Sequence, residues 1–377
     1  MSYIIIILYI IIPIIINNEI TKINLMTPVG FPYINIKIGE NDSYYNMVFD
    51  TSLHRSLLVS PKCKICTKPG YNVNNSIKIS ENQTQLKDHY LFSGDEYQDT
   101  AQISSLDKFK INFLSFTNVT FASEVGTNGF FGFSFTNYKL NTSKKLFALL
   151  YKNSYVSLHI GDFDKEIMTN YSLLKNYTIS YNENKTQWFL LSDNLKINDK
   201  NVKTKEKQKL ILDSSTTNLY IPKKFFFDNI DIIFNEDNNC QILASGIFSC
   251  VCDENYKTKF GNFQFNISGE ILFINVTDYI SFDSSIRGNN CYVYIIINYV
   301  NEYWVAGNNV LNNYYCIFDI DNNTLRLYDI QVLYENNSKF IIVFFVVFFI
   351  SILSFFGGYL LYKKYYIDNE DERVETQ

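Results

Sequence analysis

The sequence predicts an all-β protein with two lobes, and three observations support this prediction. Aromatic and β-branched residues, which favour strands, are abundant, with 29 Tyr and 32 Phe among 377 residues. Short apolar segments alternate with Asn-rich turns, whereas helical patterns are scarce. In addition, residues 47–61 and 210–222 share one pattern: an apolar run, an aspartate, small hydroxyl residues and a second apolar run.

The expected strands follow one another along the central part of the chain. Tyr33–Gly39 alternates with period two and ends at a hairpin signal over residues 39–42. The next strand leads into the first aspartate, and a glycine-interrupted apolar segment covers residues 128–133. Further strands are expected over residues 98–103, 155–161 and 187–191.

The two aspartates of the repeated pattern are Asp50 and Asp213. A carboxylate at the end of a buried strand is unfavourable unless neighbouring donors satisfy it. Its repetition in both halves of the chain indicates two lobes that bring two carboxylates together. Two adjacent carboxylates cannot both ionise freely, so such a pair shares a proton and can act as acid and base.

The two ends of the chain predict entry into the secretory pathway and a membrane anchor. Residues 1–17 resemble a signal peptide in length and apolarity, although an uncleaved anchor is the alternative. Residues 340–361 are free of charge and long enough for a transmembrane helix. Lys363 and Lys364 follow directly, which places residues 362–377 in the cytosol by the positive-inside rule.

The resulting interpretation is a single-pass type I membrane glycoprotein of the secretory pathway, cell surface or an acidic vesicle. Several N-x-S/T sites and all seven cysteines precede the apolar segment, as expected for a lumenal or extracellular region. A net charge of −5 and the lack of a basic patch argue against nucleic acid as a partner. We expect an N-terminal lobe over residues 18–165, a C-terminal lobe over 166–332 and a stalk over 333–339.

At this point the chain resembles the pepsin-like aspartic proteases. Their two Asp-Thr-Gly motifs are matched at Asp50 and Asp213, and their Asp-Gly-Ile-Leu-Gly segment is matched by residues 128–133. Near the end, their Trp-x-Leu-Gly-Asp, Tyr-Tyr and Phe-Asp series is similar to residues 304–308, 314–315 and 318–319. The order of these matches along the chain implies the bilobal pepsin-like fold.

The resemblance also implies roles for individual residues. Asp50 and Asp213 would be the catalytic pair, one activating water and the other polarising the scissile carbonyl. Thr51 and Ser214 would supply hydroxyls that cross between the lobes, and Tyr90 would cover the cleft from a β-hairpin flap. An ordinary strand aromatic is the alternative for Tyr90. No cofactor and no metal are expected.

The chain departs from the family at both glycines of the motifs, which are Ser52 and Ser215. The hydroxyl residue that follows is retained as Thr216 in the second motif but replaced by Leu53 in the first. Losing one hydrogen bond to a charged group typically costs about 1.5–3 kcal/mol, so the first half of the site is expected to be the weaker. The short stretch between the apparent signal peptide and Tyr33 leaves little room for an inhibitory pro-segment.

The cysteines follow the family in part. The resemblance implies a small loop closed by Cys63–Cys66, with a redox or zinc pair as the weaker alternative. In the second lobe we expect Cys240–Cys250 and Cys252–Cys291, while Cys250–Cys291 stays open as an alternative. Cys316 is left over and is expected to be a buried small hydrophobe.

These expectations favour a monomeric, membrane-anchored aspartic endopeptidase acting on peptide or protein substrates. The main alternative is a catalytically inactive pepsin-like glycoprotein that binds peptides or protein partners. A structural coat or adhesion role is a third possibility, for which no motif speaks directly.

Overall fold

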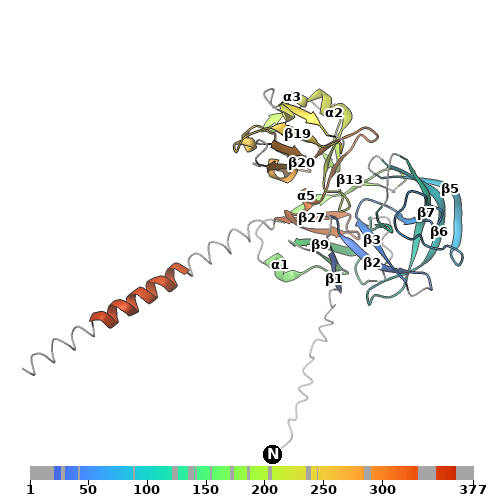
Figure 1. The fold of residues 1–377 in the computed structure, drawn as a ribbon, viewed down its shortest axis with the longest axis horizontal. Coiled ribbons are helices and arrows are strands. Elements are labelled where there is room, and N and C mark those ends of the chain that lie inside the picture. Colours follow the sequence, from blue (N-terminus) through green and yellow to red (C-terminus); the bar gives the residue numbers. More distant parts are fainter. Residues whose placement is uncertain are drawn as a thin grey trace, which may run out of the picture. The chain divides into compact units, whose positions relative to one another are not determined.

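The structure is a computed structural model of the chain (Figure 1), and it describes fifteen stretches of it. These are residues 21–26, 30–40, 43–87, 90–120, 126–134, 140, 142–152, 155–169, 174–184, 187–202, 206–234, 239–243, 245–283, 290–329 and 345–361. The expected signal peptide over 1–17, the stalk over 333–339 and the tail over 362–377 lie outside the described residues. The described residues up to Tyr328 form one compact unit, and the described residues from Asp329 belong to a second.

The first part of the compact unit consists of strands with short connections. They are β1 (Thr21–Met26), β2 (Tyr33–Ile38), β3 (Tyr44–Asp50), β4 (Ser56–Val59), β5 (Ile77–Lys87), β6 (Tyr90–Ile103), β7 (Phe109–Thr120), β8 (Gly129–Gly132), β9 (Leu146–Lys152) and β10 (Tyr155–Ile160). The strands expected from the sequence over residues 33–39, 98–103 and 155–161 lie within or overlap β2, β6 and β10, and the glycine-interrupted segment 128–133 contains β8.

The second part adds short helices to further strands. The strands are β11 (Leu174–Thr178), β12 (Ser180–Tyr181), β13 (Trp188–Ser192), β14 (Asn194–Ile197), β15 (Lys200–Asn201), β16 (Gln208–Leu212), β17 (Leu219–Pro222), β18 (Cys240–Ile242), β19 (Phe248–Val251), β20 (Phe263–Ile267), β21 (Glu270–Ile274), β22 (Ile280–Asp283), β23 (Asn290–Val293), β24 (Ile295–Asn298), β25 (Trp304–Ala306), β26 (Tyr314–Asp319) and β27 (Thr324–Asp329). The helices are α1 (Lys165–Thr169), α2 (Lys223–Asp228), α3 (Ile230–Ile233), the 3₁₀ turn η1 (Tyr256–Thr258), α4 (Val276–Tyr279) and α5 (Asn308–Leu311).

One strand arrangement occurs twice and positions both aspartates. In the first copy β3 pairs in parallel with β8, which pairs antiparallel with β4, and β4 pairs in parallel with β7. In the second copy β16, β25, β17 and β24 are connected in the same sequence of parallel and antiparallel pairs. The aspartates end β3 and follow β16, so each lies at the same place in its copy.

A glycine allows the central strand of each copy to pass close to the loop that follows the aspartate. A Cβ atom on Gly132 would lie 2.8 Å from the carbonyl oxygens of Leu53 and Arg55. A Cβ atom on Gly307 would meet the backbone of Thr216 and Asn218 in the same way. Both positions therefore need a residue without a side chain.

Strands from both expected lobes share one sheet. In this thirteen-stranded sheet, β26 and β27 from the end of the compact unit lie next to β9 and β11, with Tyr315 opposite Leu150. At the other end of the sheet, β5, β6 and β7 lie side by side, as Figure 1 shows. This end forms a long hairpin, β5–β6, whose strands pair from Ile77↔Gln98 to Lys87↔Tyr90.

The core consists of aromatic and branched aliphatic side chains, as the composition predicts. The larger cluster includes Phe49, whose ring contacts those of Phe131 and Phe147. A smaller cluster lies between β4 and the β6–β7 pair and includes Leu53 and Phe92. This second cluster fixes the hairpin to the segment that follows Asp50.

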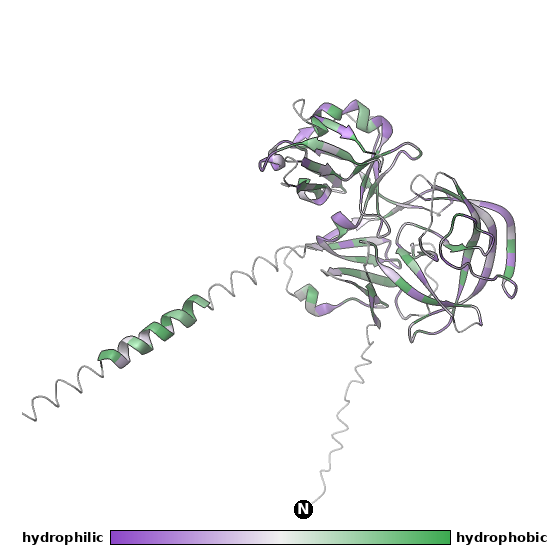
Figure 2. Ribbon diagram, in the orientation of Figure 1, coloured by the Kyte–Doolittle hydropathy of each residue, from purple (hydrophilic) through white to green (hydrophobic). Residues whose placement is uncertain are grey.

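The C-terminal unit contains a helix over residues 345–361, and Figure 2 shows that most of its residues are hydrophobic. This helix covers the described part of the expected 340–361 span, whose first residues lie outside the described ones. Within the described parts of the chain, no helix combines the length and the apolarity needed to cross a membrane.

Candidate active site

Asp50 and Asp213 lie together in the compact unit. Their side chains are 0% and 1% exposed, so both carboxylates are withdrawn from water. The hydroxyl of Ser52 lies 2.7 Å from Asp50 Oδ1 and 2.9 Å from Asp213 Oδ2. Because one hydroxyl reaches both carboxylates, the fold brings the repeated aspartates into a single polar site.

The two serines that replace the motif glycines have matching roles in this site. The Ser215 hydroxyl lies 2.8 Å from Asp50 Oδ2 and 2.5 Å from Asp213 Oδ1, so each serine contacts both aspartates. A hydroxyl carries one proton to donate and can accept as well. Two hydroxyls that bridge two carboxylates can therefore hold a pair that shares a proton.

Backbone amides add further donors to the carboxylates. The amides of Ser52 and Leu53 donate to Asp50 Oδ1 at 2.7 and 2.9 Å, and the Ser215 amide donates to Asp213 Oδ1 at 2.8 Å. The Ser52 hydroxyl, one position before Leu53, donates to the same Oδ1 atom. The expectation that Leu53 weakens the first half of the site stays a prediction.

Thr51 and Ser214 cross-link the two motif loops in a symmetrical way. Thr51 Oγ1 donates to the Leu212 carbonyl at 2.8 Å, and Ser214 Oγ donates to the Phe49 carbonyl at 2.6 Å. In return, the amide of each of these two residues donates to the hydroxyl of the other, at 3.2 and 3.1 Å. These four buried bonds fix the relative position of the loops that carry the aspartates.

Other side chains support these loops, and no sequence pattern indicated their roles. Trp188 Nε1 donates to the Thr51 carbonyl at 3.0 Å, and Asn308 Nδ2 donates to the Ser214 carbonyl at 2.8 Å. Thr216, expected beside the second carboxylate, accepts a hydrogen bond from the Asn218 amide at 3.3 Å. The Ser215 hydroxyl, rather than a residue further along, is the one that bridges the carboxylates.

The comparison with known protein families agrees with this geometry. The family described as eukaryotic aspartyl protease matches residues 32–329, which include both motifs and all the strands around them. The chain belongs to the eukaryotic aspartyl protease family. None of the curated proteins compared with it matches.

The site also contains Lys87, which no pattern in the sequence indicated. Its side chain is buried, and its Nζ lies 2.7 Å from Asp50 Oδ2 and 3.3 Å from Asp213 Oδ2. It also donates to the Ser215 hydroxyl. The sequence does not reveal this role, because the polar residues at the end of the hairpin give no indication of which side chain points toward the carboxylates.

The lysine decides the charge state of the first aspartate. Burial of Asp50 by itself would raise the pKa of its carboxyl group, because the charged form loses its hydration. The positive charge and hydrogen bond of Lys87 act in the opposite direction, together with the hydroxyls of Ser52 and Ser215. Their combined effect is larger, so the pKa of Asp50 lies below its ordinary value. This carboxyl group is therefore held as a carboxylate.

Tyr90, the expected cleft-covering residue, lies at the start of β6 and pairs with Lys87 across the hairpin. Its ring packs against the cluster that contains Leu53 and Phe92. The hairpin expected as the flap is thus present, but the side chain that reaches the aspartates comes from the β5 strand. The role expected for Tyr90 stays a prediction.

A cavity of about 160 Å³ borders Asp213. It is lined from three directions, by the first motif loop, by the end of β5 and by the second half of the chain; its lining includes Ser52, His54, Gln85, Lys87, Asp213 and Tyr303. Burial is the main cause that lowers the pKa of His54 to about 4, so this histidine is neutral at physiological pH.

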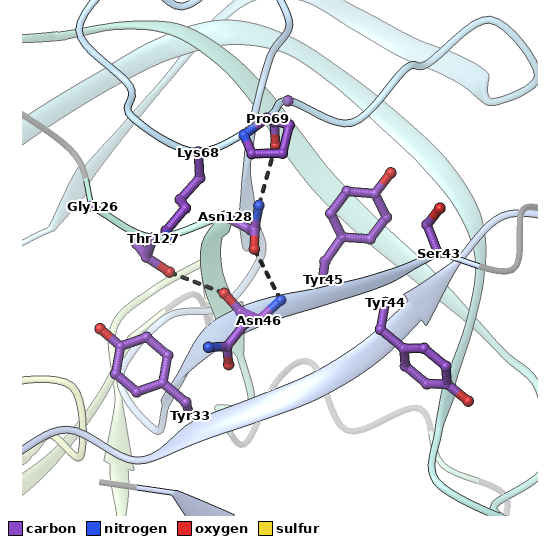
Figure 3. Close-up of a pocket in the computed structure, with 11 residues that line it drawn as sticks. Tyr33, Ser43, Tyr44, Tyr45, Asn46, Lys68, Pro69, Gly126, Thr127 and Asn128 are labelled. Atoms are coloured by element: carbon purple, nitrogen blue, oxygen red, sulfur yellow. Dashed lines mark hydrogen bonds between the residues drawn. The ribbon is translucent and has the colours of Figure 1, made fainter. Parts of the chain in front are cut away.

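A larger cavity of about 400 Å³ lies elsewhere, over β3 and the loop before β8. Figure 3 shows its tyrosine and asparagine side chains, with the Asn128 side chain joining the Asn46 amide at 3.0 Å and the Pro69 carbonyl at 3.2 Å. Neither a carboxylate nor a thiol is among the described residues that line it. Of these two cavities, the smaller one is therefore the one lined by a carboxylate, that of Asp213.

Three disulfides brace the compact unit, and they join the pairs expected from the resemblance: Cys63–Cys66, Cys240–Cys250 and Cys252–Cys291. The alternatives of a zinc pair at Cys63 and of a Cys250–Cys291 bridge are thus not adopted. Cys316 is a free, buried thiol. The Cys63–Cys66 loop packs against the smaller apolar cluster and so supports the segment after the first motif.

Proposed function

We propose that this protein is an aspartic endopeptidase that hydrolyses peptide bonds with Asp50 and Asp213. The observation that carries the proposal is the pair of buried carboxylates bridged by the hydroxyls of Ser52 and Ser215, at distances of 2.5 to 2.9 Å. Membership of the eukaryotic aspartyl protease family supports a peptidase function of this kind.

In this mechanism one carboxylate accepts a proton from water while the water oxygen attacks the peptide carbonyl carbon. The other, protonated carboxyl group donates a hydrogen bond to the carbonyl oxygen and stabilises the charge that develops there. As the carbon–nitrogen bond breaks, a proton passes to the leaving nitrogen. No covalent bond forms between the protein and the substrate, so no separate nucleophilic side chain is needed.

The test is hydrolysis of an unfolded protein by the purified full chain at about pH 5, where a carboxylate pair can hold one proton. We expect Asp50→Asn and Asp213→Asn each to lower the rate at least about a hundredfold, the order of magnitude of general acid–base catalysis. Asp193→Asn is the matched control, because Asp193 forms a half-exposed surface ion pair with Lys207.

Cleavage that persists in Asp50→Asn or in Asp213→Asn would contradict the proposal, since it would come from another group or another protein. Absence of cleavage from both the wild-type chain and a folded Lys87→Met variant would contradict it too. The second condition is needed because the ammonium group of Lys87 occupies oxygen atoms of both aspartates.

A second candidate function is a pepsin-like glycoprotein that binds peptides or protein partners without cleaving them. One specific observation favours it: Lys87 contacts the same two carboxylates that catalysis would require. In this case the full chain would bind peptides with similar affinity whether or not Asp213 is replaced by Asn. The endopeptidase remains our first choice because both aspartates are present and each accepts hydrogen bonds from neighbouring hydroxyl and amide groups.

We further propose that the protein is anchored in a membrane of the secretory pathway, with the compact unit on the lumenal or extracellular side. The support is the charge-free run over residues 340–361 followed by Lys363 and Lys364, together with three disulfides in the compact unit. Extraction of the full chain from membranes by detergent but not by alkaline carbonate would test the anchor. Release by carbonate would contradict it.

A further inference from the structure

The ammonium group of Lys87 is fully coordinated inside the site. Three acceptors surround it: Asp50 Oδ2 at 2.7 Å, Asp213 Oδ2 at 3.3 Å, and the Ser215 hydroxyl. A lysine ammonium carries three protons, so each can be donated to one of these groups. The side chain is about 3% exposed, and a lysine buried to this degree requires such partners. The ammonium group of Lys87 is therefore buried among three hydrogen-bond acceptors, unlike the lysine of a surface ion pair.

Arg55 holds the hairpin that carries this lysine. Its guanidinium group donates to the Thr84 carbonyl at 2.6 Å, to Gln85 Oε1 at 3.2 Å and to Glu96 Oε2 at 3.1 Å. Arg55 lies in the segment that follows the first motif, so the loop of Asp50 grips both strands of the hairpin. The rigid fork of an arginine is well suited to such a clamp.

The position of the ammonium group conflicts with catalysis. A water molecule attacking a peptide must hydrogen-bond to the carboxylates, and a carbonyl oxygen must reach the same pair. Lys87 contacts the Oδ2 atom of both aspartates, whereas the backbone amides of the two motif loops donate to the Oδ1 atoms. Ammonium and reacting groups therefore compete for one set of atoms.

From this geometry we propose that Lys87 is an autoinhibitory latch, carried by the β5–β6 hairpin and clamped by Arg55, which must leave the aspartates before a peptide can be cleaved. The proposal rests on the proposed endopeptidase function, whose site it regulates. It assigns the inhibitory cation to a segment inside the compact unit. Lys87 can then leave the aspartates by a movement of the hairpin end, and no cleavage of the chain is required.

The test uses pepstatin, a transition-state analogue with a hydroxyl group for the two carboxylates, as a binding probe that needs no catalysis. In the full chain, Lys87→Met removes the charge and keeps much of the side-chain volume. We expect its dissociation constant for pepstatin at about pH 5 to fall at least about tenfold, because the competing ammonium is gone. Hydrolysis of an unfolded protein is measured on the same preparations and is expected to accelerate.

Lys78→Met is the matched control. Lys78 lies on the same strand, but its ammonium pairs with Glu81 at 2.7 Å and Asp95 at 3.0 Å on the exposed side of the hairpin. Pepstatin affinity should be unchanged in this variant. Arg55→Gln serves as a second variant that loosens the clamp without touching the aspartates, and it should tighten pepstatin binding in the same direction, whether or not Lys87→Met folds.

The outcomes separate the latch from the endopeptidase function. Tighter pepstatin binding without hydrolysis in any variant supports the latch and contradicts the function. Equal pepstatin affinity in wild type, Lys87→Met and Arg55→Gln overturns the latch, whatever the rate of hydrolysis. Failure of all three to bind pepstatin also overturns it, because removing the lysine would then expose no competent pair of aspartates.

Discussion

The hydroxyl group of Ser215 lies 2.8 Å from Asp50 Oδ2, so a residue of the second motif hydrogen-bonds to the carboxylate of the first. The same hydroxyl lies 2.5 Å from Asp213 Oδ1 and accepts a hydrogen bond from Lys87. In most of the family, as the resemblance implies, this position is a glycine. The serine thus converts a position needed for close backbone packing into a polar bridge between the two halves of the site.

We expect Ser215→Ala to lower the free energy of unfolding by about 2 kcal/mol, since a hydrogen bond to a charged group contributes about 1.5–3 kcal/mol. Denaturant titration of the full chain measures it. Ser192→Ala is the matched control, because Ser192 is also buried but donates only to the neutral carbonyl of Asn194. Its expected loss is about 1 kcal/mol. Equal losses in the two variants would show that the bridge between the carboxylates adds no stability.

The cross-link between the motif loops predicts a larger effect at Thr51. Thr51→Val removes the hydroxyl that donates to the Leu212 carbonyl and accepts from the Ser214 amide, leaving both buried groups without that partner. We expect the free energy of unfolding to fall by about 3 kcal/mol, because each unsatisfied buried group costs about 1–3 kcal/mol. Thr51→Ser keeps the hydroxyl and should retain most of the stability; a loss as large as that of Thr51→Val would argue against the cross-link.

Gly132 is expected to tolerate no side chain. In Gly132→Ala the new Cβ would lie 2.8 Å from the backbone of Arg55 and Leu53, so the loop after Asp50 must shift. Overpacking of this kind typically costs about 1–3 kcal/mol, and here it also displaces the clamp on the hairpin. Gly126→Ala is the control, because no atom lies within 4 Å of its Cβ position. Thermal unfolding of both variants tests this, and an unchanged melting temperature for Gly132→Ala would contradict it.

Asp278 predicts a pH dependence of stability. Burial raises the pKa of this carboxyl group to about 6, against the smaller lowering effect of hydrogen bonds from Asn275, Asn313 and Thr277. The folded state therefore binds more protons than the unfolded state between about pH 4 and 6, so this group makes stability fall as the pH rises through that range.

Replacing Asp278 by Asn removes this titration. The wild type should lose about 2–3 kcal/mol of its free energy of unfolding through this group between pH 4 and pH 7, because a shift of two pKa units corresponds to nearly 3 kcal/mol. Asp278→Asn lacks this loss, so the free energy of unfolding of the variant minus that of the wild type should rise by the same amount. Urea titrations at the two pH values give the difference. A stability difference between the two proteins that stays constant with pH would contradict the raised pKa.

The sequence was sufficient for those features that depend on local pattern. Alternating apolar residues predicted the strand at Tyr33, because every second side chain of a half-buried strand faces the core. The repeated segments at Asp50 and Asp213 predicted that two carboxylates would meet, since an isolated buried aspartate is unfavourable. The departures at Ser52 and Ser215 were also visible, although the sequence alone indicated a loss and not a replacement of hydrogen bonds.

Only the tertiary structure decided what surrounds the two carboxylates. The Ser52 hydroxyl lies within hydrogen-bonding distance of both carboxylates, and Lys87, far along the chain from Asp213, places its ammonium against both aspartates. Strand periodicity cannot reveal these contacts, because it tells which face a side chain takes but not which distant group the fold brings to that face. Such pairings depend on how long strands twist and cross, and this is determined by packing across the whole compact unit.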